Sequence, residues 1–186
     1  MVAAPQKYML TVDDYHRMGE AGILSEDDRV ELLDGEIWLK APIGNDHSGG
    51  LRGLDYVFNA AVRGRAIVDT QNPIRLSDYS EPQPDLVLLA PRADFYRSAM
   101  PRPEDVLLLV EVADSSLAFD RTVKLPRYAR DGIREVWIVD LVHRRIETYN
   151  APVDGVFTET AVFARGQSVS SRAFPDIAIA VTDVLG

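Results

Sequence analysis

Two apolar segments that each carry an acidic residue constrain this chain most. The first, residues 86–89, reads Leu-Val-Leu-Leu and follows Asp85, and the second, residues 106–113, contains Glu111. Both are rich in Val and Leu and are bounded by Pro or charged residues, a pattern that predicts adjacent buried strands. The sequence therefore predicts a buried sheet in which two neighbouring strands each hold one carboxylate.

The spacing of these strands predicts which residues face each other. If the strands pair antiparallel across the 91–105 connection with Ala90 opposite Val106, the same register places Asp85 opposite Glu111. Directly opposed residues have Cβ atoms about 4.5–5.5 Å apart, so the two carboxylates repel each other. A shared proton, a cation or a metal ion is needed to neutralise them.

Length and charge limit the class of protein. A chain of 186 residues with 46% hydrophobic residues fits one domain, residues 1–186, with a sizeable core. The net charge of −9 argues against a protein that coats nucleic acid broadly, although it is compatible with a local basic patch. The absence of cysteine excludes disulfides and thiolate metal sites.

The N-terminal segment, Met1–Lys7, lacks a charged leader followed by an apolar run, so no signal peptide is expected. No apolar run approaches the roughly 20 residues that span a bilayer. We therefore expect a cytoplasmic protein without a membrane partner.

Turn and capping signals predict the first elements. Thr11 precedes a short helix with acids in its first turn, and Asp34-Gly35 is the two-residue turn of a hairpin over residues 29–40. That turn pairs Glu31 with Trp38. Glu31 is therefore either on a face of the hairpin that is not fully exposed to solvent, or a solvated acid of the strand.

A helix is predicted from His47 onward, because an apolar stripe follows it through residues 51–61. A histidine at the start of a helix either forms a structural hydrogen bond or takes part in function, and both interpretations stay open.

A second helix is predicted to begin near Ala118 and to carry Asp120, Lys124 and Tyr128 along one side. Pro126 kinks this helix unless it lies in the first turn.

The remaining elements define the expected fold class. Further strands are predicted at residues 66–69, 74–76, 136–139, 144–149 and 156–163. The predicted fold is α/β (α+β), with a mixed central β-sheet flanked by helices and an N-terminal β-hairpin.

The ordered motifs resemble a nuclease superfamily. Pro84-Asp85, Glu111-Val112-Ala113 and Lys124 are similar to the PD-(D/E)xK pattern, which implies a restriction-endonuclease-like fold. The resemblance is closer to one branch, the Uma-type restriction endonuclease family, over residues 8–150. The residues that match this branch also include residues 31–36, His47, Asp120, Tyr128 and residues 132–140.

One position departs from the superfamily pattern. A lysine usually lies two residues after the glutamate, and here that position is Ala113, on the same strand face as Glu111. The small side chain leaves room for a lysine from elsewhere, and the Uma-type branch implies Lys124.

The resemblance implies metal-dependent chemistry at these residues. Carboxylate oxygens suit Mg²⁺ or Mn²⁺, so Asp85 and Glu111, with the backbone carbonyl of Val112, are the expected metal ligands. Lys124 is expected to orient the attacking water or offset developing charge. The expected supporting residues are Glu31, His47, Asp120 and Tyr128.

The expected activity is endonucleolytic hydrolysis of DNA. An alternative is a catalytically inactive protein of the same fold that serves as a dimerisation or partner-binding module, because the in-line lysine is missing. A homodimer is also expected, because an enzyme that cuts a duplex must address two strands and because the chain offers more aromatic area than a small sheet edge needs, in Trp137, Tyr149, Phe157 and Phe163.

Overall fold

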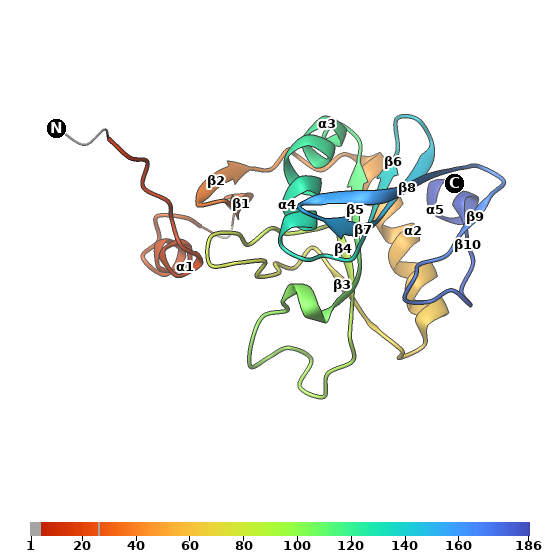
Figure 1. Ribbon diagram of the computed structural model, residues 1–186, viewed down its shortest axis with the longest axis horizontal. Coiled ribbons are helices and arrows are strands. Elements are labelled where there is room, and N and C mark those ends of the chain that lie inside the picture. The colour runs from red at the N-terminus through yellow and green to blue at the C-terminus, as the bar shows by residue number, and fades with distance from the viewer. Residues whose placement is uncertain (1–4, 26) are drawn as a thin grey trace.

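A six-stranded mixed sheet forms the centre of the molecule, in a computed structural model that describes residues 5–25 and 27–186 (Figure 1). The strand order is β3-β4-β5-β6-β7-β8, in which β5 and β6 run parallel and all other neighbours run antiparallel. The strands are β3 (Ile67–Thr70), β4 (Leu86–Leu89), β5 (Val106–Ala113), β6 (Glu135–Asp140), β7 (Arg145–Val153) and β8 (Val156–Ala164). Residues 1–4, part of the segment in which no leader is expected, lie outside the described residues.

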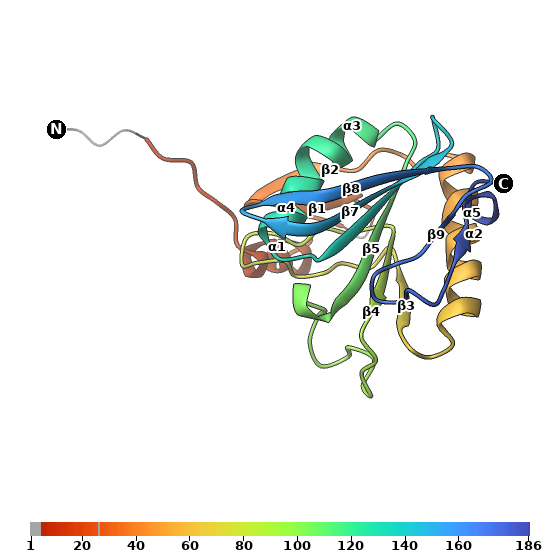
Figure 2. The same ribbon diagram turned by 45° about the vertical axis from the view of Figure 1, so that its right-hand side comes forward.

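Helices cover the two faces of this sheet, as Figure 2 shows. One face packs on α2 (Asn45–Val62) and α5 (Val181–Leu185), which share a core cluster with alternate residues of β5 such as Leu108 and Val110. The other face packs on α4 (Leu125–Arg130), which shares a second cluster with Leu109. The predicted fold class, a mixed sheet flanked by helices, is confirmed.

The register of β4 and β5 confirms most of the predicted pairing. Leu86 pairs with Val110 and Leu88 with Leu108, so the ladder continues toward Asp85 opposite Glu111. A bulge between Leu88 and Leu89 shifts the pairing by one residue at the other end. Leu89, not Ala90, therefore pairs with Val106, and that part of the predicted register is wrong.

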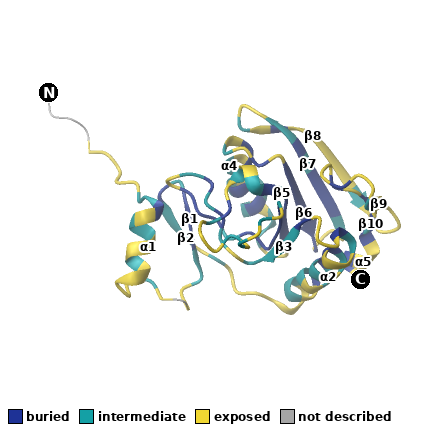
Figure 3. Cartoon of the chain, turned by 90° about the horizontal axis from the view of Figure 1, so that it is seen from below, coloured by how far each residue is buried: buried dark blue, intermediate teal, exposed yellow. Residues whose placement is uncertain are grey.

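The N-terminal elements form a separate layer. The hairpin of β1 (Val30–Leu33) and β2 (Glu36–Leu39) has the predicted pairing of Glu31 with Trp38. Before it, α1 (Val12–Glu20) begins at the predicted cap, where Thr11 and Asp14 form a reciprocal capping box. Figure 3 shows that α1 is largely exposed, whereas the central strands are buried.

Two local predictions differ from the structure. Residues 74–76 form no strand, because Ile74 N–H donates to Pro82 O and Leu76 N–H donates to Ser80 O within a local turn. Their apolar side chains are nevertheless buried, which explains the strand-like pattern. The helix that follows Ser116 is interrupted by one π-helical turn between α3 (Leu117–Phe119) and α4.

The π-helical turn, η2 (Asp120–Lys124), ends two residues before Pro126. Proline has no N–H to donate and its ring clashes with the preceding turn of an α-helix, so a wider turn here removes that conflict. Pro126 itself lies in the first turn of α4, where proline is tolerated.

The remaining short elements connect or close these layers. They are a 3₁₀ turn at Pro103–Asp105 (η1), the pair β9 (Ser168–Val169) and β10 (Ile179–Ala180), and the C-terminal α5. No helix among the described residues has the length and apolar character needed to cross a membrane.

The aromatic residues that suggested a dimer surface pack largely inside the protein. Trp137 is 0% exposed and Phe157 is buried, while Tyr149 and Phe163 are partly buried against the two cores. That basis for a homodimer is therefore wrong, and the homodimer itself stays a prediction.

The Asp34-Gly35 turn offers a test of the hairpin. Gly35 has a φ of +71°, and a Cβ there would lie 2.9 Å from Met9 Cβ. We expect Gly35→Ala to lower the free energy of unfolding by about 1–2 kcal/mol or more, measured by urea denaturation. The matched change Gly49→Ala in α2, where a Cβ meets nothing within 4 Å, should raise it by about 0.5–1 kcal/mol. Equal stability of the two variants would contradict the turn geometry.

Candidate functional site

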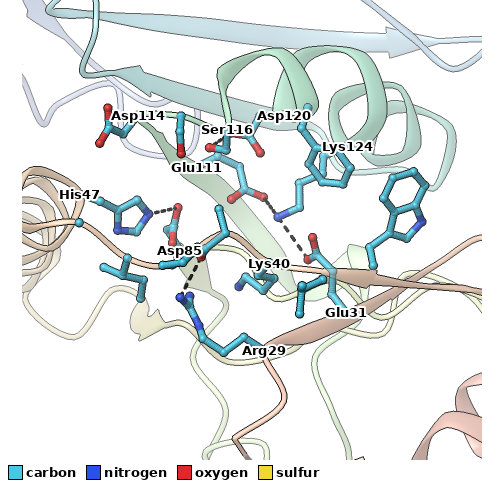
Figure 4. A pocket seen from close by; sticks show the side chains of 18 residues that line it. Arg29, Glu31, Lys40, His47, Asp85, Glu111, Asp114, Ser116, Asp120 and Lys124 are labelled. Atoms are coloured by element: carbon cyan, nitrogen blue, oxygen red, sulfur yellow. Dashed lines mark hydrogen bonds and ion pairs between the residues drawn. The ribbon is translucent and has the colours of Figure 1, made fainter.

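A pocket of about 290 Å³ lies between the hairpin, the start of α2 and the segment that follows β5. Figure 4 shows acidic and basic side chains from all three regions pointing into it. Its lining residues include Arg29, Glu31, Trp38, Lys40, His47, Asp85, Glu111, Asp114, Ser116, Phe119, Asp120 and Lys124. Six of the predicted site residues therefore line one cavity: Glu31, His47, Asp85, Glu111, Asp120 and Lys124. Val112 and Tyr128 are outside this lining and contact Asp85 and Glu111, respectively.

Asp85 is held in one orientation by two donors. Its Oδ2 lies 3.1 Å from His47 Nε2 and accepts a hydrogen bond of 2.8 Å from the Val112 backbone N–H. Burial alone would raise the pKa of Asp85, but the hydrogen bond and charge of His47, with the Val112 amide, hold that pKa below its ordinary value. Asp85 is therefore an anion in the folded protein near neutral pH.

Glu111 and Lys124 form a buried ion pair. Lys124 Nζ donates to Glu111 Oε1 at 2.9 Å, and the Tyr128 hydroxyl donates to the same oxygen at 2.5 Å. The predicted contact of Lys124 with a site carboxylate is confirmed. Both charged groups are nearly inaccessible, with exposed fractions of 3% for Glu111 and 4% for Lys124.

Glu31 completes this ion-pair cluster from the hairpin. Its Oε2 lies 3.3 Å from Lys124 Nζ and accepts a hydrogen bond of 3.1 Å from the Gln83 backbone N–H. Glu31 is buried, so the interpretation as a solvated strand acid is wrong. Lys124 thus lies between two carboxylates from different layers of the fold.

The environment sets the protonation of these groups. Burial raises the pKa of Glu111 to about 7, against the opposing effect of Lys124. Burial would lower the pKa of Lys124, but the charges of Glu111, Glu31 and Asp120 outweigh it and hold that pKa well above its ordinary value. Lys124 is therefore an ammonium group throughout the neutral range.

The chain connectivity explains why Lys124 reaches Glu111. Parallel strands such as β5 and β6 need a crossover connection, and here residues 117–130 form a helical crossover that packs back on the sheet. Glu111 and Asp85 both lie on the sheet face that this crossover covers, as the shared side of Leu109 and Val87 indicates.

The π-helical turn changes the partners expected for Asp120. An α-helical spacing of four residues predicted that Asp120 and Tyr128 flank Lys124 and hold it. Instead the Asp120 carboxylate accepts a hydrogen bond of 2.7 Å from Ser116 Oγ, and Tyr128 contacts Glu111. The wider π-helical turn alters the angular spacing between positions 120 and 124, which the sequence pattern did not reveal.

Sequence reasoning missed several residues of the pocket. Arg29 and Lys40 form one more pair beyond the last pair of the ladder, where Lys40 N–H donates to Arg29 O. Each is two residues from Glu31 or Trp38, so all four side chains lie on the same face of the hairpin. The two-residue alternation that placed Glu31 and Trp38 on one face could have found both. Phe119 carried no such signal.

Gln83 links the hairpin to the strand that carries Asp85. Its backbone N–H bonds to Glu31, while its backbone carbonyl and its side-chain oxygen accept from Lys40 Nζ at 2.8 Å and 3.0 Å. Both strands of the hairpin are therefore tied to the segment two residues before Asp85.

The donor set fits a hard divalent cation that keeps waters of its own. Within the described residues no group of three or more His, Asp or Glu side chains is placed to hold a metal. Mg²⁺ is nevertheless usually bound through one or two carboxylates plus waters and substrate oxygens. Asp85 and Glu111 each use one oxygen for the contacts above, so Asp85 Oδ1 and Glu111 Oε2 remain for a cation. The Val112 carbonyl points to the same strand edge as its N–H, the edge where Asp85 lies.

Comparison with known proteins identifies the family. The model of the Uma2 family, described as "Putative restriction endonuclease", matches residues 12–182. The chain belongs to the Uma2 family. This match continues past residue 150, where the resemblance seen in the sequence ended.

A solved structure has the same fold. It is described as a "putative nuclease belonging to DUF820" from Anabaena variabilis ATCC 29413, and it is 17% identical to this Uma2 chain. The similarity covers 95% of this chain and 97% of the other, with a TM-score of 0.72. No curated protein matches significantly. The fold of this Uma2 chain is thus restriction-endonuclease-like, as predicted.

The buried ion pair is tested by a double-mutant cycle. Lys124→Met leaves Glu111 and Glu31 without their cation, so we expect it to lower the free energy of unfolding by about 3–5 kcal/mol in urea denaturation. Adding Glu111→Gln should recover part of that loss, because the double variant buries one charge fewer. The exposed Lys7→Met should change stability by less than about 0.5 kcal/mol. Simple additivity of the two site substitutions would contradict the coupling.

Proposed function

We propose that this protein is a metal-dependent endonuclease that hydrolyses phosphodiester bonds of DNA. The observation that carries the proposal is the convergence of Asp85, Glu111 and Lys124 in one pocket, from two strands and a crossover helix. Membership of the Uma2 family and the restriction-endonuclease-like fold support it.

Asp85, Glu111 and the Val112 carbonyl would hold Mg²⁺ or Mn²⁺. When bound, the metal supplies Lewis-acid activation of water and charge neutralisation at the phosphate. His47 orients Asp85 by holding Oδ2, which leaves Oδ1 directed away from the imidazole. In this proposal His47 therefore has a positioning role on Asp85.

Lys124 acts in this proposal as a fixed positive charge. Its raised pKa makes it a poor proton acceptor near neutral pH, so a role as general base does not fit. Its ammonium group instead offsets the negative charge that develops on the phosphate as the water oxygen attacks and the bond to the leaving sugar oxygen breaks. Glu31 holds the ammonium from the other side.

A second candidate is the inactive partner-binding module. The observation that favours it is that both acids already have partners within the protein: Glu111 has Lys124 and Tyr128, and Asp85 has His47. A buried network of this kind also occurs as a purely structural feature. Measurements of metal binding and of DNA cleavage distinguish the endonuclease from the inactive module.

Metal binding is expected to depend on Asp85. Calorimetric titration of Mn²⁺ should give binding to the wild type and a loss of at least about tenfold in affinity for Asp85→Ala. Glu159→Gln, an exposed acid on β8 away from the pocket, is the matched control and should bind as the wild type does. Equal Mn²⁺ binding by wild type and Asp85→Ala would contradict the assignment of Asp85 as a metal ligand.

Cleavage is expected to depend on Lys124. A plasmid-nicking assay should show Mg²⁺- or Mn²⁺-dependent nicking by the wild type and none by Lys124→Ala, because the transition-state charge loses its counter-ion. Circular dichroism at the assay temperature checks that the variant is folded, and Lys7→Ala serves as a control outside the pocket. Activity retained by a folded Lys124→Ala protein would favour the second candidate.

A further inference from the structure

The pocket has a second half that the proposed chemistry does not use. Arg29, Trp38 and Lys40 lie on the pocket side of the hairpin, and Phe119 faces them from α3. Figure 4 shows Arg29 and Lys40 on the side of the pocket opposite Ser116 and Asp120.

The two cations of this half have donors to spare. Arg29 Nη1 donates to Ala41 O at 2.8 Å, and Lys40 Nζ donates only to the two oxygens of Gln83. Neither forms an ion pair with any residue that the structure describes, whereas Arg121 and Arg145, outside the pocket, both pair with Glu147. A guanidinium has five N–H donors and an ammonium three, so both groups can still bind an anion.

The electrostatics of Lys40 also suit an anion. Burial and the neighbouring Lys124 ammonium lower the pKa of Lys40. An anion beside Lys40 would stabilise its charged form and reverse this shift. The phosphate groups of a nucleic acid chain are anions of this kind.

The aromatic pair provides an apolar surface beside these cations. The rings of Trp38 and Phe119 are 5.2 Å apart between centroids and tilted by 52°. Trp38 Nε1 is buried and has no hydrogen-bond partner among the described residues. Trp38 and Phe119 both line the pocket, and an aromatic surface of this kind fits the flat face of a nucleobase.

The depth of the site limits the form of nucleic acid that can enter. The carboxylates beneath are nearly inaccessible, with exposed fractions of 7% for Asp85 and 3% for Glu111. The pocket, about 290 Å³, matches the small end of the range for single small ligands, which begins near 300 Å³. In an intact duplex the bases are stacked on both sides, so an aromatic residue can stack only on an unpaired or extruded base.

We infer that Arg29, Lys40, Trp38 and Phe119 form a nucleotide subsite for single-stranded DNA, with a phosphate on the two cations and its base against the two rings. This inference rests on the proposed function, and it names the substrate as an unpaired strand rather than an intact duplex. The adjacent phosphate along the strand, outside the subsite, is then the one that reaches Asp85, Glu111 and Lys124.

Tryptophan fluorescence tests the subsite without any cleavage. The chain has two tryptophans, and Trp137 is fully buried, so a ligand in the pocket changes mainly the emission of Trp38. A ten-nucleotide oligothymidylate titrated in EDTA should quench the wild type, and it should leave Trp38→Phe emission nearly unchanged. A blunt DNA hairpin with no unpaired end should bind at least tenfold more weakly.

Variants separate the two halves of the subsite. Phe119→Ala should weaken oligothymidylate binding by about 5- to 150-fold, the range for loss of one stacking partner. Arg29→Gln with Lys40→Gln should reduce the slope of log affinity against log salt by about 0.7, because the two cations neutralise one phosphate and each phosphate neutralised on a single strand contributes about 0.7. Phe95→Ala and Lys7→Gln, exposed and outside the pocket, should change neither quantity.

The possible results distinguish this inference from the proposed function. Absence of Trp38 quenching, or equal affinity for the blunt duplex, overturns the subsite even if the protein nicks plasmids. Quenching by oligothymidylate through Trp38, with no cleavage in any divalent metal, supports the subsite and refutes the nuclease activity. Thermal melting of each variant shows whether lost binding reflects lost folding.

Discussion

The ammonium group of Lys124 lies between two buried carboxylates, and the arrangement of the layers depends on that contact. Glu111 comes from the central sheet, Glu31 from the hairpin and Lys124 from the crossover helix. A buried charge without a partner costs several kcal/mol, so each of these elements stabilises the position of the other two. The same contact places a fixed positive charge next to the two acids of the pocket.

The sequence predicted the parts of the site that follow short-range rules. The period of two along residues 106–113 placed Glu111 and Ala113 on one face, and the Asp34-Gly35 turn fixed the pairing of Glu31 with Trp38. Both rules depend on backbone geometry that a few neighbouring residues determine. Lys124 came instead from the resemblance to the Uma-type branch, since the position two residues after Glu111 holds alanine.

Other features depend on longer-range contacts and escaped prediction. The π-helical turn before Pro126 redirects Asp120 to Ser116, and a bulge at Leu88 shifts the end of the central ladder. Residues 74–76 have a strand-like apolar pattern, but the N–H groups of Ile74 and Leu76 bond to Pro82 and Ser80 within a local turn.

The hydrogen bonds of Gln83 have a mechanical consequence. The backbone N–H of Gln83 is bonded to Glu31 of β1 and its backbone carbonyl to Lys40 at the end of β2, and Pro84 alone separates Gln83 from Asp85. Proline stiffens that link because its φ is fixed. Any outward swing of the hairpin would therefore pull on the strand that carries Asp85, so the wall of the pocket and its floor should move as a single rigid body rather than as a flap over a fixed base.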